Sequence, residues 1–201
     1  MTSFTLPPLP SELTWKNEPV SFATPGNASL DILAGPLSDW FHNPGSQAVT
    51  RNAPVALFTP PAENFSLSAK VNVEFKSTYD AGVLFVYVND ETWAKLCFEF
   101  SPQKEAMVVS VVTRGRSDDC NSALIGGHTI FLRVYRQADA LAFHYSTDGQ
   151  TWRFVRFFTI GSLAAMRIGF AAQSPTGPGC QVHFSQIDFR LRNISDLRDG
   201  T

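Results

Sequence analysis

Charged residues are scarce in this chain of 201 residues. Only 17% of the residues are charged, against about 25% in an average globular protein, and the formal net charge is −2. No basic patch occurs along the sequence. Proteins that bind nucleic acids or anionic membranes carry a positive surface. We therefore expect neither of those partners and expect a small-molecule ligand or substrate instead.

Long apolar segments and cysteine pairs are also missing. No run of about 18 apolar residues occurs, as a membrane-spanning helix would require. The N-terminus, MTSFTLPPLPSELTW, has neither the basic start nor the continuous apolar stretch of a signal peptide. Cys97, Cys120 and Cys180 are odd in number and far apart, which is not the pattern of a disulfide scaffold. These absences together predict a cytoplasmic protein.

Helical periodicity does not extend beyond a turn or two, and apolar and polar residues alternate instead. From Leu67 to Phe75 every second residue is apolar, which is typical of a half-buried strand. Asp148-Gly149 lies between two such segments and is a strong hairpin signal. The further expected strands are Val83–Val88, Trp93–Phe100, Met107–Thr113, Thr129–Arg136, Leu141–Ser146, Trp152–Phe158, Met166–Gln173 and Gln181–Arg192.

This density of short strands predicts an all-β fold. We expect nine or ten strands from Asn64 onward, with one or two before it. Many closely spaced strands are typical of two antiparallel sheets packed face to face, as in a jelly-roll β-sandwich. No internal repeat or linker divides the chain, so we expect one domain over residues 1–201, with an N-terminal extension and the first strands in 1–36.

One polar stretch, TRGRSDDCNS at Thr113–Ser122, follows a buried strand and has four charges within six residues. We interpret it as a loop that closes a hairpin. Asp118 and Asp119 are expected to form ion pairs with Arg114 and Arg116. These pairs would fix the loop over one end of a ligand cleft.

Polar residues within strands identify the faces that point outward. On one expected strand, Trp93, Lys95 and Glu99 share a face that mixes an aromatic ring with two opposite charges. His144 and Gln173 are polar residues in other expected strands, and Arg114 directly follows one. If these faces belong to one curved sheet, they line a common groove. The alternatives are a surface ion pair of Lys95 with Glu99 and an ordinary buried histidine at 144.

No cofactor or metal is predicted. Asp118, Asp119 and Asn121 could supply oxygen ligands for Ca²⁺, but they lack the spacing and the number of oxygens that such a site needs. The four histidines show no zinc-binding spacing. Glycoside hydrolysis would require two carboxylates, such as Glu99 with one of the two aspartates. A metal-free lyase, isomerase or cyclase could use Lys95, Glu99, Arg114 and His144 for acid, base and anion stabilisation.

Several motifs in the same order resemble a known family. They are WAKLCFEFSP from Trp93, SVVTRGRSDDCNS from Ser110, FHYSTDGQTWRFVRFF from Phe143, GFAAQSPTGPGC from Gly169, and the shorter DWF (39–41), YDAG (79–82) and DLRDG (196–200). Over residues 37–200 the chain resembles the "regulation of enolase" family of concanavalin A-like domains, whose function is largely unknown. The resemblance implies a concanavalin A-like jelly roll.

That superfold is shared by lectins, glycosidases, lyases and proteins without catalytic activity, so the resemblance alone does not assign a function. In members that bind sugars, the ligand lies across the concave sheet and aromatic side chains stack on it. This implies Trp40 and Trp93 as stacking residues, and Asp118, Asp119, Asn121 and Gln173 as further ligand contacts.

The first functional hypothesis is a module that binds a small, carbohydrate-like molecule. The alternative is a metal-free enzyme that acts on a small molecule in the same cleft. A third is a structural or regulatory interaction protein with these residues dispersed over its surface. The sequence leaves the oligomeric state open.

Overall fold

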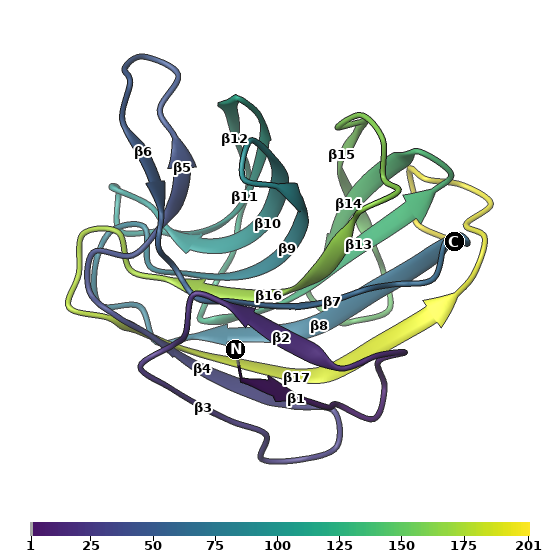
Figure 1. Ribbon diagram of the computed structural model, residues 1–201, viewed down its shortest axis with the longest axis horizontal. Coiled ribbons are helices and arrows are strands. Elements are labelled where there is room, and N and C mark those ends of the chain that lie inside the picture. The colour runs from purple at the N-terminus through teal and green to yellow at the C-terminus, as the bar shows by residue number, and fades with distance from the viewer. Residues whose placement is uncertain (1) are drawn as a thin grey trace.

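Two antiparallel sheets stack face to face in the computed structural model, which describes residues 2–201 (Figure 1). The first sheet has eight strands, in the order β1 (Ser3–Phe4), β2 (Leu13–Lys16), β7 (Val55–Phe58), β16 (Arg167–Gln173), β9 (Ala81–Asn89), β10 (Thr92–Phe100), β11 (Ala106–Arg114) and β12 (Arg116–Leu124). The second has seven, in the order β15 (Arg153–Phe158), β14 (Ala140–Ser146), β13 (Thr129–Gln137), β8 (Phe65–Val73), β17 (Cys180–Leu191), β4 (Leu30–Ala34) and β3 (Ser21–Ala23). The expected jelly-roll β-sandwich is confirmed.

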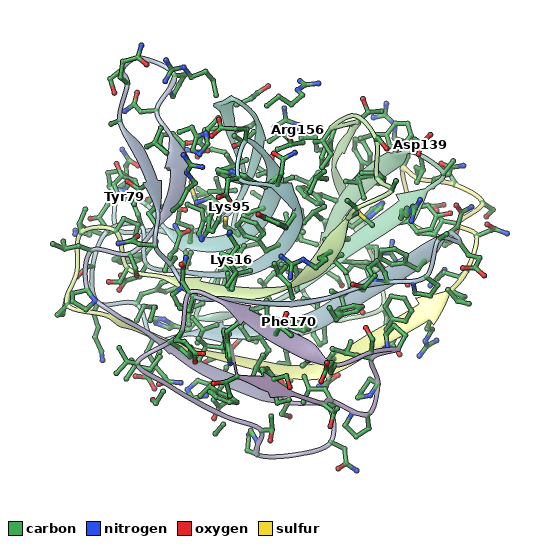
Figure 2. All side chains as sticks on the ribbon, viewed as in Figure 1. Lys16, Tyr79, Lys95, Asp139, Arg156 and Phe170 are labelled. Carbon is green, nitrogen blue, oxygen red and sulfur yellow. The ribbon has the colours of Figure 1, made fainter. Side chains whose placement is uncertain are left out.

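The main core lies between the two sheets. Strand alternation directs the inward residues there, and on β10 these are Ala94, Leu96 and Phe98, all fully buried. Phe170 of β16 meets Phe184 of β17 across the interface, with ring centroids 5.1 Å apart, and Figure 2 shows Phe170 between the layers. Burial of each such side chain contributes about 1.5–3 kcal/mol to folding.

A second apolar layer covers the opposite face of the eight-stranded sheet. The hairpin formed by β5 (Trp40–His42) and β6 (Val49–Arg51) packs on this face, and Figure 1 shows it standing beside the curled strands β9–β12. Trp40 of the hairpin lies edge-on to Trp93 of β10, with ring centroids 5.9 Å apart. The outer face is therefore apolar at one end and open only at the other.

Ten strands follow Asn64, as the alternation predicts, and the hairpin at Asp148-Gly149 joins β14 to β15. Before Asn64 there are seven strands and not one or two, because each has only two to five residues and is too short to show a clear alternation. Among the described residues, no helix has the length and apolar character to cross a membrane.

The polar stretch at 113–122 is a strand and not the expected loop. Gly115, with φ of +75°, makes the turn from β11 into β12, which pairs antiparallel with β11 with one register shift near Met107. β12 is the edge strand of its sheet. Charged side chains on an edge strand discourage pairing with another molecule, which accounts for the unusual density of charge.

The contacts expected of those charges are also wrong. Arg116 donates to the carbonyl of Ser46 at 2.7 Å and to Gln47 at 2.8 Å, so it holds the β5–β6 hairpin and not the aspartates. Asp118 pairs with Arg156 of β15 at 2.9 Å, and Figure 2 shows Arg156 in the gap between β12 and β15. This ion pair joins the edges of the two sheets.

Candidate ligand-binding cleft

A polar cleft of about 310 Å³ lies where the hairpin leaves the outer face of the eight-stranded sheet uncovered. Figure 2 shows Lys95 between the hairpin and the curled strands, with Tyr79 on the same side of the molecule. Nine residues line the cleft: Asp39, Phe41, Asn43, Tyr79, Lys95, Glu99, Val111, Asp119 and Gln173. This volume is at the lower end of the range of about 300–1,000 Å³ that is typical of ligand pockets.

Strand register brings the cleft residues together. Lys95 and Glu99 are four residues apart on β10 and therefore face the same side. Val111 of β11 lies opposite Lys95 and also opposite Asp119 of β12. Gln173 of β16 lies opposite Ala81, which in turn lies opposite Glu99. Three non-adjacent strands thus contribute polar groups to one surface.

Lys95 is the buried cation of the cleft, with only 2% of its surface exposed. Its ammonium donates to Asp39 Oδ1 at 3.0 Å and to Gln173 Oε1 at 2.9 Å. Burial by itself lowers the pKa of Lys95, but Asp39 and, to a lesser degree, Cys97 and Glu99 outweigh burial and raise that pKa above its ordinary value. Lys95 is therefore a fixed positive charge and not a neutral nucleophile.

Glu99 is the unusual acid of the cleft. Its pKa is raised to about 8, chiefly because burial disfavours the carboxylate, with further contributions from the negative charges of Asp119 and Asp39 against the opposing effect of Lys95. At pH 7 Glu99 is therefore mainly protonated and can donate a proton or a hydrogen bond.

Asp119 supplies the second carboxyl group of the open part of the cleft. Asp119 is exposed on β12, the edge strand of its sheet. Partial loss of hydration raises its pKa, and Asp39 adds to the rise, while Lys95 opposes it. Three carboxyl groups thus share one buried ammonium.

Two loops are tied together behind the cleft. Ser174 donates to Asp80 Oδ1 at 2.7 Å, and the other oxygen of Asp80 accepts two backbone amides. Ser174 also exchanges backbone hydrogen bonds with Ser38. Gln173 donates to the carbonyl of Tyr79 at 3.2 Å. These bonds fix the positions of Asp39, which follows Ser38, and of Tyr79, which precedes Asp80.

Replacing Glu99 with glutamine is expected to change how stability depends on pH. The pKa of Glu99 in the folded protein is about 8, above its ordinary value of 4.5, so the unfolded chain releases this proton more readily. Wild-type stability therefore has a component that is present below about pH 4.5 and is lost as pH rises towards 8.

The Glu99→Gln variant lacks this component. Relative to wild type, its free energy of unfolding should increase by at least about 1 kcal/mol between pH 5 and pH 8.5. Urea denaturation at the two pH values measures this difference. A difference that stays constant with pH would contradict the assignment.

The two expected stacking residues are not available to a ligand. Trp40 is 1% exposed and Trp93 is fully buried, because Trp40 of the β5–β6 hairpin packs against Trp93 between the hairpin and the sheet. The aromatic rings that do line the cleft are those of Phe41 and Tyr79, and Tyr79 is 39% exposed. The stacking role implied for the two tryptophans is therefore wrong.

His144 does not share the cleft with Glu99. It lies on β14 of the other sheet and points to that sheet's outer face, where Nε2 bonds to the carbonyl of Leu197 at 2.8 Å. Burial, which outweighs this bond, lowers the pKa of His144 to about 4. The histidine is a neutral group buried beneath the C-terminal segment, as in the alternative interpretation.

Arg114 also lies outside the cleft. Its side chain is exposed at the end of β11 and donates to the carbonyl of Thr159 at 3.3 Å. Asp118 and Asn121 are exposed on β12 and do not line the cleft. Of the expected site residues, the structure brings together Lys95, Glu99, Asp119 and Gln173.

Five lining residues were not predicted as contacts: Asp39, Phe41, Asn43, Tyr79 and Val111. Asp39, Phe41 and Tyr79 lie within the short DWF and YDAG motifs. These motifs indicated the family but no role for their residues. Among residues 2–201, no group of three or more histidine, cysteine, aspartate or glutamate side chains has a geometry that could hold a metal ion.

Solved structures share this fold. A functionally unknown protein from Saccharomyces cerevisiae aligns with a TM-score of 0.83 and 24% identity, over 90% of this chain and 97% of that one. The GH43 BlXynB protein from Bacillus licheniformis aligns with a TM-score of 0.66 and 14% identity, over 82% of this chain and 33% of that chain. An alginate lyase from Klebsiella pneumoniae gives 0.54 and 13%, over 85% and 84%. The fold therefore occurs in carbohydrate-active enzymes.

Sequence comparison also identifies relatives of this chain. The Saccharomyces cerevisiae protein named Regulation of enolase protein 1 is 29% identical over 179 residues, which are 88% of each chain. A family model described as protein of unknown function (DUF1349) matches residues 15–191. With most of its length covered by that model, and with the motifs of the regulation of enolase family in order, this chain belongs to the DUF1349 family.

Proposed function

We propose that the cleft binds a small polyhydroxylated molecule of the carbohydrate class. The observation that carries this proposal is the lining itself, in which carboxyl, amide and ammonium groups surround the rings of Phe41 and Tyr79. Sugars present hydroxyl groups at their edges and apolar C–H groups on their faces, so they match polar groups beside an aromatic ring. A volume of about 310 Å³ suits a ligand of about one or two sugar rings.

The fold is consistent with this ligand class, since it occurs in carbohydrate-active enzymes. Gln173 Oε1 and Asp39 Oδ1 already accept hydrogen bonds from Lys95, and Gln173 also donates to the backbone carbonyl of Tyr79. Because these bonds hold both side chains in place, their remaining lone pairs are oriented before a ligand binds. Glu99 has no side-chain hydrogen bond to any described residue, and its proton is free to be donated to a ligand oxygen.

Binding should depend on Tyr79. In a panel of mono- and disaccharides screened by saturation-transfer NMR, we expect at least one sugar to bind. Tyr79→Ala should weaken its affinity by about 10-fold, because truncation of an aromatic contact commonly costs more than about 1 kcal/mol. Phe157→Ala is the control, since Phe157 is 49% exposed on the other sheet. The proposal fails if no sugar binds, or if both variants bind alike.

A second candidate function is proton transfer to or from the bound molecule. The raised pKa of Glu99 favours it, since a carboxyl group with a pKa near neutrality serves as both acid and base. Lys95, held as a cation, would stabilise negative charge that develops on the substrate. This arrangement corresponds to an isomerase or lyase that uses no metal.

Deuterium incorporation separates catalysis from binding. A sugar that binds should gain deuterium at carbon in D₂O if Glu99 transfers a proton, and NMR detects the exchange. In Glu99→Gln the exchange should disappear while the sugar still binds. Binding without exchange in the wild-type protein would leave the binding function and reject the catalytic one.

We further propose a cytoplasmic location. All three cysteines are unpaired thiols, and Cys120 is exposed, which is the usual condition of a protein in a reducing compartment.

A further inference from the structure

A second polar depression lies on the outer face of the seven-stranded sheet, far from the strands that form the cleft. Its volume is about 490 Å³, and β8, β13, β17 and the turn between β14 and β15 surround it. Its lining includes the hydrogen-bond donors Ser66, Ser68, Arg133 and Arg192. Strand alternation explains the direction of the two serines, because the next residues on β8, Leu67 and Ala69, belong to the core.

Arg133 is a buried cation in this depression, with 2% of its surface exposed. Its guanidinium stacks on the ring of Trp152 at 4.2 Å and donates from Nη2 to the carbonyl of Gly200 at 2.9 Å. Nε has no hydrogen-bond partner among the residues that the structure describes. Within residues 2–201, no carboxylate lies within 4.0 Å of Arg133. A buried charge without a counter-ion is unfavourable, so Arg133 favours the binding of an anion.

The charges next to Arg133 leave the depression with a net positive charge, which favours an anion. Asp188 also lines the depression, but Arg190 pairs with it at 2.9 Å and neutralises it. Arg192 remains as a second positive charge. Burial and, to a lesser extent, Arg192 lower the pKa of Arg133 to about 10, so Arg133 is still a cation at neutral pH. His144, opposite Arg133 in register, has a pKa of about 4 and adds no charge.

Two hydroxyl groups complete the set of donors. Ser68 lies directly opposite Arg133, and Ser66 lies two residues away on the same face of β8. No side-chain hydrogen bond joins either hydroxyl to another described residue, although both line the depression. Guanidinium groups bind phosphate and sulfate oxygens through pairs of parallel hydrogen bonds, and serine hydroxyls can reach the remaining oxygens.

We propose that this depression binds a tetrahedral oxyanion, namely the phosphate or sulfate group of a small molecule. Arg133 and Arg192 supply the charge, and Ser66 and Ser68 supply the neutral donors. The site lies on the other sheet from the cleft, so the two can be occupied independently.

Titration with inorganic phosphate at constant ionic strength tests the proposal. Trp152 is half-buried in the depression, whereas Trp15, Trp40 and Trp93 are at most 2% exposed, so tryptophan fluorescence should report on this site. We expect a saturable change in fluorescence and a rise in Tm with phosphate. Sulfate should act similarly, and planar acetate should bind more weakly.

Variants then locate the binding. Arg192→Gln and Arg133→Lys should each weaken phosphate binding by about 10-fold or more, because each loses charge-assisted hydrogen bonds. Arg114→Gln removes the same charge from the other sheet and should bind like the wild type. The proposal is overturned if phosphate gives no more effect than chloride, if acetate binds as tightly, or if Arg192→Gln binds normally.

Discussion

The Lys95→Met variant should bind no sugar in the cleft and should lose about 3 kcal/mol of its free energy of unfolding. Methionine keeps most of the unbranched apolar stem of lysine, at the position opposite Phe85 on β9, so most of the apolar packing is retained. What disappears is the only positive charge in the cleft lining. Asp39, now without its partner at 3.0 Å, would remain as a mostly buried carboxylate, and removal of one member of a buried ion pair is strongly destabilising.

A double variant separates charge from packing. Lys95→Met combined with Asp39→Asn removes both charges, so it should recover much of the stability but none of the binding. Lys104→Met is the matched control, since Lys104 is exposed and its ammonium donates to Thr78 on the surface. Its stability should stay within about 0.5 kcal/mol of wild type. Urea denaturation and sugar titration measure the two effects. If Lys95→Met bound sugar with wild-type affinity, Lys95 would not be part of the binding site.

Among glycine-to-alanine substitutions in the sandwich, Gly169→Ala should cause the largest loss of folding stability. Gly169 lies in β16 opposite Leu57 of β7, and a Cβ there would overlap the carbonyl oxygen of Ala56. Because the clash is with backbone and not with the end of a flexible side chain, β7 would have to move. We expect a loss of about 3 kcal/mol or more and a Tm lower by on the order of 10 °C.

Gly126→Ala is the control for that substitution. A Cβ at Gly126 meets no atom within 4 Å, so this variant should unfold at nearly the wild-type temperature. Thermal unfolding followed by circular dichroism compares the two. If Gly169→Ala matched Gly126→Ala, the close contact of β16 with β7 would be wrong.

The sheet class and most long strands could be predicted because alternation is a local property. β12 could not, since its residues Arg116–Leu124 are polar on both faces and so have no apolar period. Its strand character comes from pairing with β11, which is a tertiary effect. The same polar composition that hides an edge strand in the sequence protects it in the folded protein.

The cleft was predicted in part, for a related reason. Alternation shows which side of a strand a residue faces, so it grouped Lys95 with Glu99 correctly. It does not show which sheet contains the strand, and this is why His144 was placed with them. Nor does it show what covers a face. Trp93 shares its face with Lys95, but the β5–β6 hairpin buries one and leaves the other in the cleft.

Cys120 lies on β12 next to Asp119, and because neighbours on a strand alternate, the two side chains point to opposite faces. Cys97 and Cys180 are buried, and burial raises the pKa of both thiols, so they react slowly. The native chain therefore offers a single attachment point for a maleimide fluorophore or a spin label. Such a probe would sit one residue behind the cleft without blocking it, and could report a bound ligand with no engineered cysteine.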